Sequence, residues 1–388
     1  MPSLQPPAAR MRFQLGAFTF TRTVLNTAFR MVYPFLPVFA RGLGVDLPTI
    51  ALAVTARSSV GLASPILGSI ADARGRKATM LLGLVLFSVG ASLVAIWPLF
   101  PVLVVSMVLA TLGKVLFDPT MQAYLGEHIH YSRRGLAIAV TEFGWSGAFL
   151  LGVPLAGWAI AARGWTAPFP WLAALGLGAA GLLWAVLPAD EHPRRPSSSW
   201  AGGLNLILRN RSAMAGLTFG ILVSLANEVV NIVFGAWLEG AFGLKVLALG
   251  AASAVIGVAE LSGEGFVAGF ADRLGKRRAV ALGTGLNAIA CVALPHLDAN
   301  IFTALVGLFG FFITFEFTLV SAIPLMTELA PGARGALMGS NIAGQSAGRA
   351  LGALVGPALF GAGLLANSTV AAGLDILALF VLLRFVRE

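Results

Sequence analysis

Charged residues are scarce in this sequence. Asp, Glu, Lys and Arg make up 11% of its 388 residues, against roughly 25% in a soluble domain, whereas hydrophobic residues make up 57%. The mean hydropathy is +0.86. This composition excludes an ordinary soluble domain and indicates an integral membrane protein. The net charge of +9 would suggest nucleic-acid binding in a soluble protein, but in so apolar a chain we interpret it as the charge of loops that set membrane orientation.

Cysteine and histidine are also rare. The single cysteine, Cys291, excludes a disulfide or a thiolate metal site built within one chain. The four histidines fall in expected loops, where a solvated surface is the simpler interpretation. The sequence contains no P-loop, no paired cysteines and no H-E-x-x-H motif. We therefore expect no enzyme activity, no cofactor, no metal site and no nucleic-acid partner.

Long apolar runs fill most of the chain. A helix needs roughly 20 apolar residues to cross a bilayer, and each run is about that long. The runs predict twelve transmembrane spans. Their expected ranges are 15–40, 47–68, 78–97, 99–124, 136–160, 168–188, 212–238, 246–270, 279–297, 299–327, 336–360 and 367–386.

Basic residues lie almost entirely on one side of these spans. The other side holds only Arg41, Arg163 and Lys245. Because loops rich in Lys and Arg stay in the cytoplasm, we expect both termini to be cytoplasmic, in a bacterial inner membrane or a plasma membrane.

The chain divides into two expected bundles. We predict a disordered N-terminus over 1–12, a six-helix bundle over 13–188, a cytoplasmic linker over 189–211 and a second six-helix bundle over 212–388. The linker contains Pro193, Pro196 and a run of serines. From Trp200 onward it forms either a short amphipathic helix on the membrane surface or a plain loop.

One short basic loop occurs twice, 200 residues apart. The first copy contains Gly68, Asp72, Gly75 and Arg76, and the second contains Asp272, Gly275 and Lys276. A constant offset that relates residues throughout both halves indicates an internal repeat. The two halves should therefore have equivalent structures.

Six spans, a linker, six more spans and a G-x-x-x-D-x-x-G-[RK]-[RK] loop in each half resemble the major facilitator superfamily over essentially the whole chain. The resemblance implies an all-α membrane protein whose twelve transmembrane helices form two pseudo-symmetric six-helix halves, and transport by alternating access. Two positions depart from the family pattern. Ala268 replaces the first Gly of the second loop, and Ala73 replaces the usual basic residue of the first.

The repeated acidic residue predicts a gate. A carboxylate at a helix end can accept hydrogen bonds from the free N–H groups at the start of a facing helix, and the resemblance implies that this contact breaks when the cytoplasmic side opens. The alternative is a static turn whose basic residues face lipid phosphates. The expected gating residues are Gly68, Asp72, Gly75, Arg76, Asp272, Gly275 and Lys276.

Polar residues inside the spans mark a candidate site, because a charge within the membrane is costly. Arg22, Asn26 and Arg30 share one face of the first span, and Asn227 and Asn231 form a matching stripe on the seventh. We therefore expect a substrate site between the halves, although an Asn in a span can also simply join helices. The substrate-binding candidates are Arg22, Asn26, Arg30, Arg57, Lys114, Asn227, Asn231 and Glu316.

Some of these charges have alternative partners. Lys114 and Asp118 are spaced for an intrahelical ion pair, and Glu142 alternatively pairs with Arg22. Glu316 and Arg349 could neutralise one another in the same way. Asp375 is the one charge in a span that the resemblance assigns to the lipid-facing set.

Buried carboxyl groups supply the candidate proton carriers. Burial without a positive partner favours the protonated form, and Glu228, Glu260 and Glu264 have no basic partner within their own half. We expect Glu228 to carry the proton first, with Glu260 and Glu264 sharing one proton as a pair at i, i+4. Glu142 and Asp118 are the candidates of the N-terminal half.

These carboxyl groups favour a proton-coupled secondary active transporter. Within that class we favour export of amphipathic or drug-like small molecules, because charge is combined with Phe311, Phe312, Phe315 and Phe317. One alternative is uptake of an organic anion by the basic N-terminal half. Another is a flippase or scramblase for a lysolipid or glycolipid, without proton coupling. In each case we expect a monomer, and membrane lipids join the small-molecule substrate and protons as partners.

Overall fold

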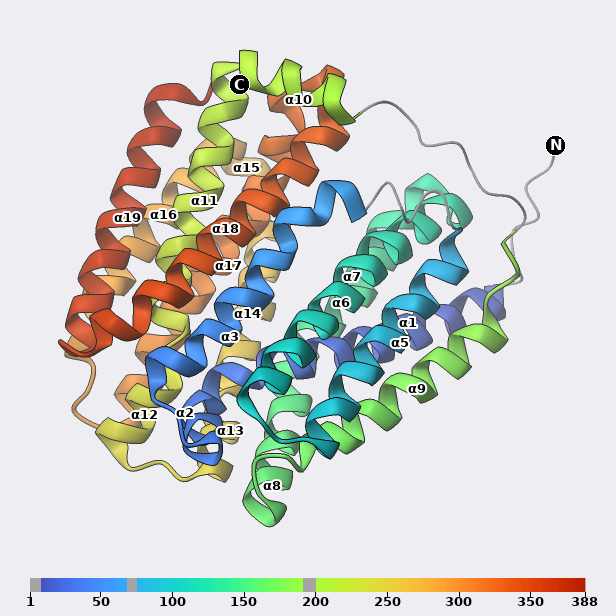
Figure 1. Ribbon diagram of the computed structural model, residues 1–388. Coiled ribbons are helices and arrows are strands. Elements are labelled where there is room, and N and C mark those ends of the chain that lie inside the picture. The colour runs from blue at the N-terminus through green and yellow to red at the C-terminus, as the bar shows by residue number, and fades with distance from the viewer. Residues whose placement is uncertain (1–7, 68–74, 191–199, 388) are drawn as a thin grey trace.

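The computed structural model describes residues 8–67, 75–190 and 200–387, and helices account for most of them (Figure 1). Gly68 and Asp72 of the expected gate lie outside the described residues. The same is true of the linker prolines at 193 and 196.

The N-terminal half contains eight α-helices and two short helical turns. The turns are a 3₁₀-helix, η1 (Val60–Ala63), and a π-helix, η2 (Ala148–Gly152). The α-helices are α1 (Ala8–Arg30), α2 (Val32–Leu43), α3 (Leu47–Ser59), α5 (Arg76–Ile96), α6 (Phe100–His128), α7 (Tyr131–Gly147), α8 (Val153–Arg163) and α9 (Pro168–Val186).

The C-terminal half repeats this pattern after α10 (Trp200–Arg209). Its short turns are η3 (Val267–Ala271), which is a π-helix, η4 (Leu294–His296) and η5 (Pro331–Ala333). Its α-helices are α11 (Arg211–Asn231), α12 (Phe234–Phe242), α13 (Val246–Ala252), α14 (Ala254–Phe266), α15 (Asp272–Leu274), α16 (Lys276–Ala293), α17 (Ile301–Leu329), α18 (Arg334–Phe360) and α19 (Leu364–Phe385).

Ten helical segments of the described residues are long and apolar enough to cross a membrane. Two further segments, α1–α2 and α18, have the length but carry more polar residues, among them Arg22, Arg30 and Arg349. Together they make the twelve spans of the expected fold. The two polar spans occupy corresponding neighbourhoods of the central cavity described below, where polar side chains need not face lipid.

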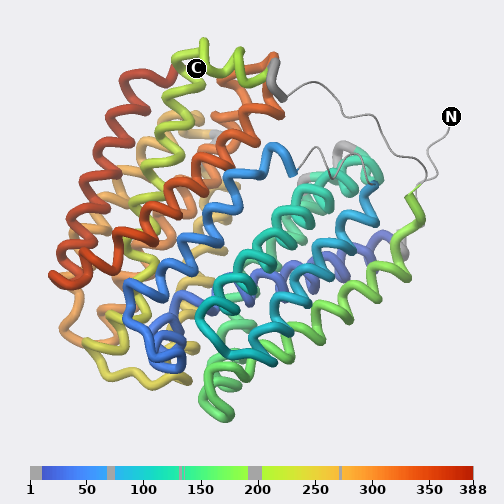
Figure 2. Tube along the Cα trace, in the orientation of Figure 1, coloured from blue at the N-terminus to red at the C-terminus, as the bar shows by residue number. Residues whose placement is uncertain are grey.

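The halves form two bundles that meet at one end of the molecule. Both termini lie at the other end, which we call the termini face (Figures 1 and 2). At the opposite face, α2 packs on α12 and α8 packs on α13. Glycines make this approach possible: a Cβ on Gly235 would lie 2.6 Å from the carbonyl oxygen of Pro34, and one on Gly250 would lie 3.4 Å from the Cα of Gly157.

Polar contacts add to the closure of the opposite face. Arg41 of α2 makes a two-bonded ion pair with Glu239 of α12, at 2.7 and 2.9 Å. Asp46 caps α3 by accepting a hydrogen bond from the Thr49 backbone N–H at 2.9 Å. The hydrogen bonds from the side chain and backbone of Thr49 lower the pKa of Asp46.

Two termini-face segments differ from the sequence expectation. Helix α1 begins at Ala8, so residues 8–12 are helical where we expected disorder. Ala, Met and Arg favour helix, which allows the first span to continue in this direction. In the linker, the helix alternative is the observed one: Ile207 of α10 is buried, and Gly203 packs on Ala336 of α18.

Candidate functional site

A cavity of about 670 Å³ lies between the halves. It extends toward the termini face, because Gln122, Ile138 and Met338 line it near the ends of α6, α7 and α18 that point there. The opposite face is closed by the packing of α2, α8, α12 and α13. The cavity is lined by five acidic side chains, namely Glu142, Glu228, Glu260, Glu264 and Glu316, and by four basic ones, namely Arg22, Arg30, Lys114 and Arg349.

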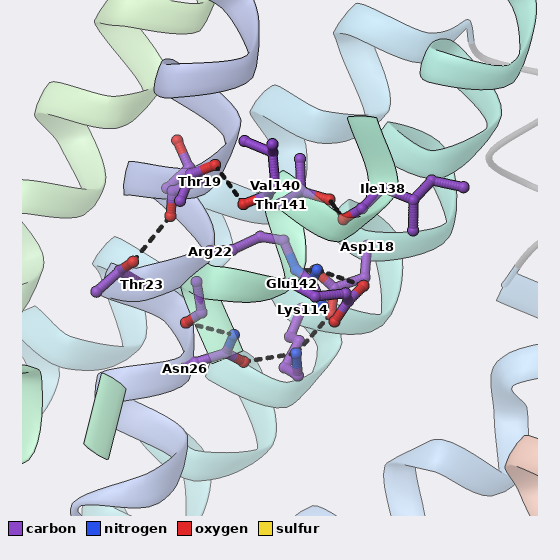
Figure 3. Close-up of polar contacts among 12 residues, drawn as sticks. Thr19, Arg22, Thr23, Asn26, Lys114, Asp118, Ile138, Val140, Thr141 and Glu142 are labelled. Atoms are coloured by element: carbon purple, nitrogen blue, oxygen red, sulfur yellow. Dashed lines mark hydrogen bonds and ion pairs between the residues drawn. The ribbon is translucent and has the colours of Figure 1, made fainter. Parts of the chain in front are cut away.

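The N-terminal wall holds a closed polar network (Figure 3). Arg22 contacts Glu142 at 2.6 Å and Asp118 at 3.3 Å. Lys114 also pairs with Asp118 and donates a hydrogen bond to the Asn26 side-chain oxygen at 2.7 Å. The Asn26 amide nitrogen donates to the Gly144 carbonyl at 3.1 Å. Every charge of this network therefore has an opposite charge beside it.

Asn26 is a structural link within this network. Its side chain is fully buried and does not line the cavity, which removes it from the expected substrate-binding set. Gly144 explains how the link forms: a Cβ there would lie 2.7 Å from the Cβ of Arg22, so only glycine allows α7 to approach α1 this closely. The alternative interpretation, an Asn that joins helices, fits Asn26.

Arg30 joins the two halves through Glu260. Its guanidinium donates to both carboxylate oxygens, and the Nη1–Oε2 distance is 2.7 Å. Each side chain of the pair is 4% exposed. Arg30 also donates to the Trp145 carbonyl at 3.2 Å and lies over the rings of Trp145 and Phe149, at 4.1 and 3.9 Å from their centroids.

This pair changes the role expected for Glu260. The sequence suggested that Glu260 and Glu264 share one proton, because neither has a basic partner in its own half. The structure gives Glu260 an arginine of the other half, 230 residues away. A charged partner stabilises the ionised carboxylate, so the expected sharing with Glu264 does not describe this conformation.

A second polar contact between the halves involves Glu228, whose carboxylate accepts a hydrogen bond from the Tyr33 hydroxyl at 3.2 Å. Sequence reasoning missed Tyr33, although its spacing of three from Arg30 places both on one helix face. The other carboxylate oxygen of Glu228 is buried without a hydrogen-bond partner among the described residues. Glu228 therefore reaches both the cavity and the opposite half.

Arg57 is not part of the central cavity, contrary to its assignment as a substrate-binding residue. It is 1% exposed, donates to the Phe29 carbonyl at 2.6 Å and lies over the rings of Phe29 and Tyr33. It borders a separate void of about 20 Å³ inside the N-terminal half. The carbonyl and the ring faces supply the partners that a buried guanidinium needs.

Three further charges line the cavity without an ion pair among the described residues: Glu264, Glu316 and Arg349. The expected pairing of Glu316 with Arg349 is therefore absent from this conformation. Asn227 and Asn231 also line the cavity, and each has a buried side-chain atom without a hydrogen-bond partner in the described part of the chain. These groups are available to a bound molecule.

The phenylalanines expected in the cavity divide into three groups. Phe312 and Phe315 line it. Phe311 is buried in the core, and Phe317 faces an external groove instead. Asp375 also differs from expectation: it is 1% exposed and lies 3.8 Å from the Cys291 sulfur, between α16 and α19, and does not face lipid.

The described residues of the repeated loops make equivalent contacts in both halves. Arg76 pairs with Glu127 at 3.0 Å, and Lys276 pairs with Glu328. Gly75 and Gly275 adopt positive φ angles of 93° and 81°, which favour glycine at the turn before the next helix. The backbone of Asp272 belongs to α15. No group of His, Cys, Asp and Glu suited to a metal ion occurs in the described part of the chain.

Comparison with known proteins identifies the family. The sequence matches the model of the Major Facilitator Superfamily over residues 18–259 and 216–388. It is 28% identical over 345 residues to the uncharacterized MFS-type transporter YceJ of Bacillus subtilis, covering 87% of this chain and 86% of the relative. It is 26% identical over 357 residues to the inner membrane transport protein YdhP of Escherichia coli, covering 89% and 90%.

Two other similarities are more limited. A stretch of 172 residues, 43% of each chain, is 28% identical to the quinolone resistance protein NorA of Staphylococcus aureus. A D-xylose-proton symporter of known structure superposes with a TM-score of 0.78 over 97% of this chain and 98% of that one, at 16% identity. This superposition concerns the fold alone. The family model and the relatives that match along most of their length agree with the two-bundle architecture and its central cavity, and the chain belongs to the Major Facilitator Superfamily of membrane transporters.

Proposed function

We propose that this transporter exports amphipathic, drug-like molecules that carry a positive charge, in exchange for protons and by alternating access. In this proposal the termini face is cytoplasmic, as the distribution of basic loops predicts, and the cavity is open to the cytoplasm. The single observation that carries the proposal is the unequal pairing of charges in the cavity.

The cations of the N-terminal wall are already engaged. Arg22, Arg30 and Lys114 each contact a carboxylate within 4 Å. The C-terminal wall contributes Glu228, Glu264 and Glu316, which have no such cation among the described residues, and Arg349 is one basic group against these three acids. The unpaired charge is therefore acidic, which supports protons and cations as ligands and disfavours uptake of an organic anion.

The remaining surface suits the apolar part of an amphipathic molecule. Phe29, Trp145, Phe149, Phe312 and Phe315 line the same cavity. Aromatic faces attract cations as well as apolar groups. A site of this kind binds by shape and charge, and the printed name of the partial relative NorA, a quinolone resistance protein, supports the same class of substrate.

The Arg30–Glu260 pair offers a physical basis for coupling. With the site empty and Glu260 ionised, the pair joins the halves and holds the opposite face closed. A proton on Glu260, or a cationic substrate that competes for its carboxylate, removes this connection. Only the loaded transporter would then change conformation easily, as exchange without leakage requires.

The test uses purified protein in liposomes with an imposed pH gradient. Ethidium serves as the cationic amphipathic probe, and an internal pH dye reports proton movement. We expect ethidium to accumulate against its gradient and to drive proton flux in the opposite direction. Flux of ethidium without any proton movement would exclude exchange and favour the uncoupled lipid-handling or uniport alternatives.

Glutamine variants assign the proton carrier. Glu228→Gln and Glu316→Gln should differ: the true carrier loses gradient-driven accumulation and retains ethidium exchange across liposomes without a gradient. The matched control is Asp298→Asn, which neutralises an exposed acid in a loop. Full accumulation in every cavity variant, including Glu264→Gln, would contradict proton coupling through these residues.

A further inference from the structure

A second, wholly apolar depression of about 460 Å³ lies on the C-terminal half, and it shares no lining residue with the central cavity. One wall is formed by Phe266, Phe270 and Leu274 of the eighth span, and the other by Leu282 and Leu286 of α16. All five side chains are between 38% and 50% exposed. We call this feature the lateral groove.

The lateral groove follows the direction of the helices. Phe266, Phe270 and Leu274 are spaced by four residues, as are Leu282 and Leu286, so each set forms a stripe along its helix. Eight residues of helix span about 12 Å, most of the roughly 15 Å that one leaflet contributes to the hydrocarbon core. Gly283 brings α16 onto α17 at the floor, where a Cβ would lie 2.5 Å from the Thr318 hydroxyl.

Basic side chains mark the end of the groove near the termini face. Arg278 precedes Leu282 by four residues, so it continues the α16 stripe by one turn. Arg273 is adjacent to Leu274 in α15. Both arginines are exposed. An apolar groove as long as a leaflet, with cations at its polar end, is complementary in shape and charge to an anionic amphiphile.

The other half shows what this position accepts. There, the carboxylate of Asp190 receives hydrogen bonds at 3.0 Å from the backbone N–H groups of Lys77 and Ala78 at the start of α5. The equivalent start of α16 follows Gly275, which makes no side-chain cap. Arg278 stands where the first half has Ala78. The second half thus has an added cation and lacks the built-in anion among its described residues.

We propose that the lateral groove binds an anionic phospholipid, with one acyl chain between the two apolar stripes and the phosphate beside Arg278 and Arg273. The backbone N–H groups at the start of α16 add to the attraction for the phosphate. Lys276 and Arg277 contribute less, because Lys276 pairs with Glu328 and Arg277 donates to the Leu383 carbonyl. The site belongs to one half, although the fold is pseudo-symmetric.

The test is lipid titration of the purified full-length transporter, with native mass spectrometry to count bound molecules. Dioleoyl phosphatidylglycerol is compared with dioleoyl phosphatidylcholine, which has the same chains and no net charge. We expect at least one phosphatidylglycerol to bind more tightly than phosphatidylcholine. Because a basic residue near the membrane surface contributes about 1 kcal/mol, Arg278→Ala should weaken this binding roughly fivefold.

Three further variants keep the test specific. Arg384→Ala removes an exposed arginine at the end of α19 and should leave the affinity unchanged. Arg278→Lys keeps the charge and should retain most of the binding. Leu282→Trp fills the groove without changing charge and should weaken it. Equal binding of the two lipids, or equal effects of Arg278→Ala and Arg384→Ala, would overturn the proposal.

Discussion

Glu260→Gln should shift the conformational balance of the transporter toward opening of the opposite face. The substitution keeps the shape of the side chain but removes the charge that neutralises Arg30. Both members of the pair are 4% exposed, and removal of one partner from a buried pair costs about 3–5 kcal/mol. If the lower figure is lost from the closed state alone, the equilibrium shifts on the order of 100-fold.

Spin labels can measure this shift directly. Arg163→Cys on α8 and Leu247→Cys on α13 place labels at exposed positions on the two halves, close to their contact. The native Cys291 is fully buried and should label poorly. We expect a short distance in the wild-type background and a larger population of long distances with Glu260→Gln.

A matched control removes the other inter-half ion pair. Glu239→Gln breaks the pair with Arg41, whose side chain is 59% exposed, and exposed pairs contribute only about 0–1 kcal/mol. Its distance distribution should remain close to that of the wild type. The reasoning is refuted if Glu260→Gln leaves the distances unchanged, or if both substitutions shift them equally.

Three other predictions test individual contacts. Gly152→Ala should lower the melting temperature, because its Cβ would lie 1.8 Å from the Thr27 hydroxyl and overpacking costs about 1–3 kcal/mol; Gly147→Ala, whose Cβ meets nothing closer than 3.8 Å, is the control in the same thermal assay. Tyr33→Phe removes the hydrogen bond to Glu228 and should alter the pH dependence of transport without abolishing ethidium binding; an unchanged pH profile would argue against this contact. Asp46→Ala should lower the melting temperature slightly at neutral pH. Because the pKa of Asp46 is lower in the folded state, its stabilisation is present above the unfolded pKa of about 4 and is lost as pH falls through the folded value, so the difference from wild type should disappear in acid.

The spans and their repetition followed from the sequence because they depend on local properties. An apolar run long enough to cross the bilayer must form a helix, since no other backbone partner is available to it there. The ion pair of Lys114 with Asp118 is similarly local, because four residues separate neighbours on one helix face. The positive φ angles at Gly75 and Gly275 explain why the repeated turns contain glycine.

The pairing of charges between the halves was decided by the tertiary structure. Glu260 and Arg30 are 230 residues apart, and Glu228 and Tyr33 are 195 apart, so no spacing rule connects them. The same packing excludes Arg57 from the cavity and buries Asp375 between two helices. Hydropathy determines which segments enter the membrane, but the partner of each buried charge depends on the rotation of its helix and on the approach of the two bundles, which long-range packing sets.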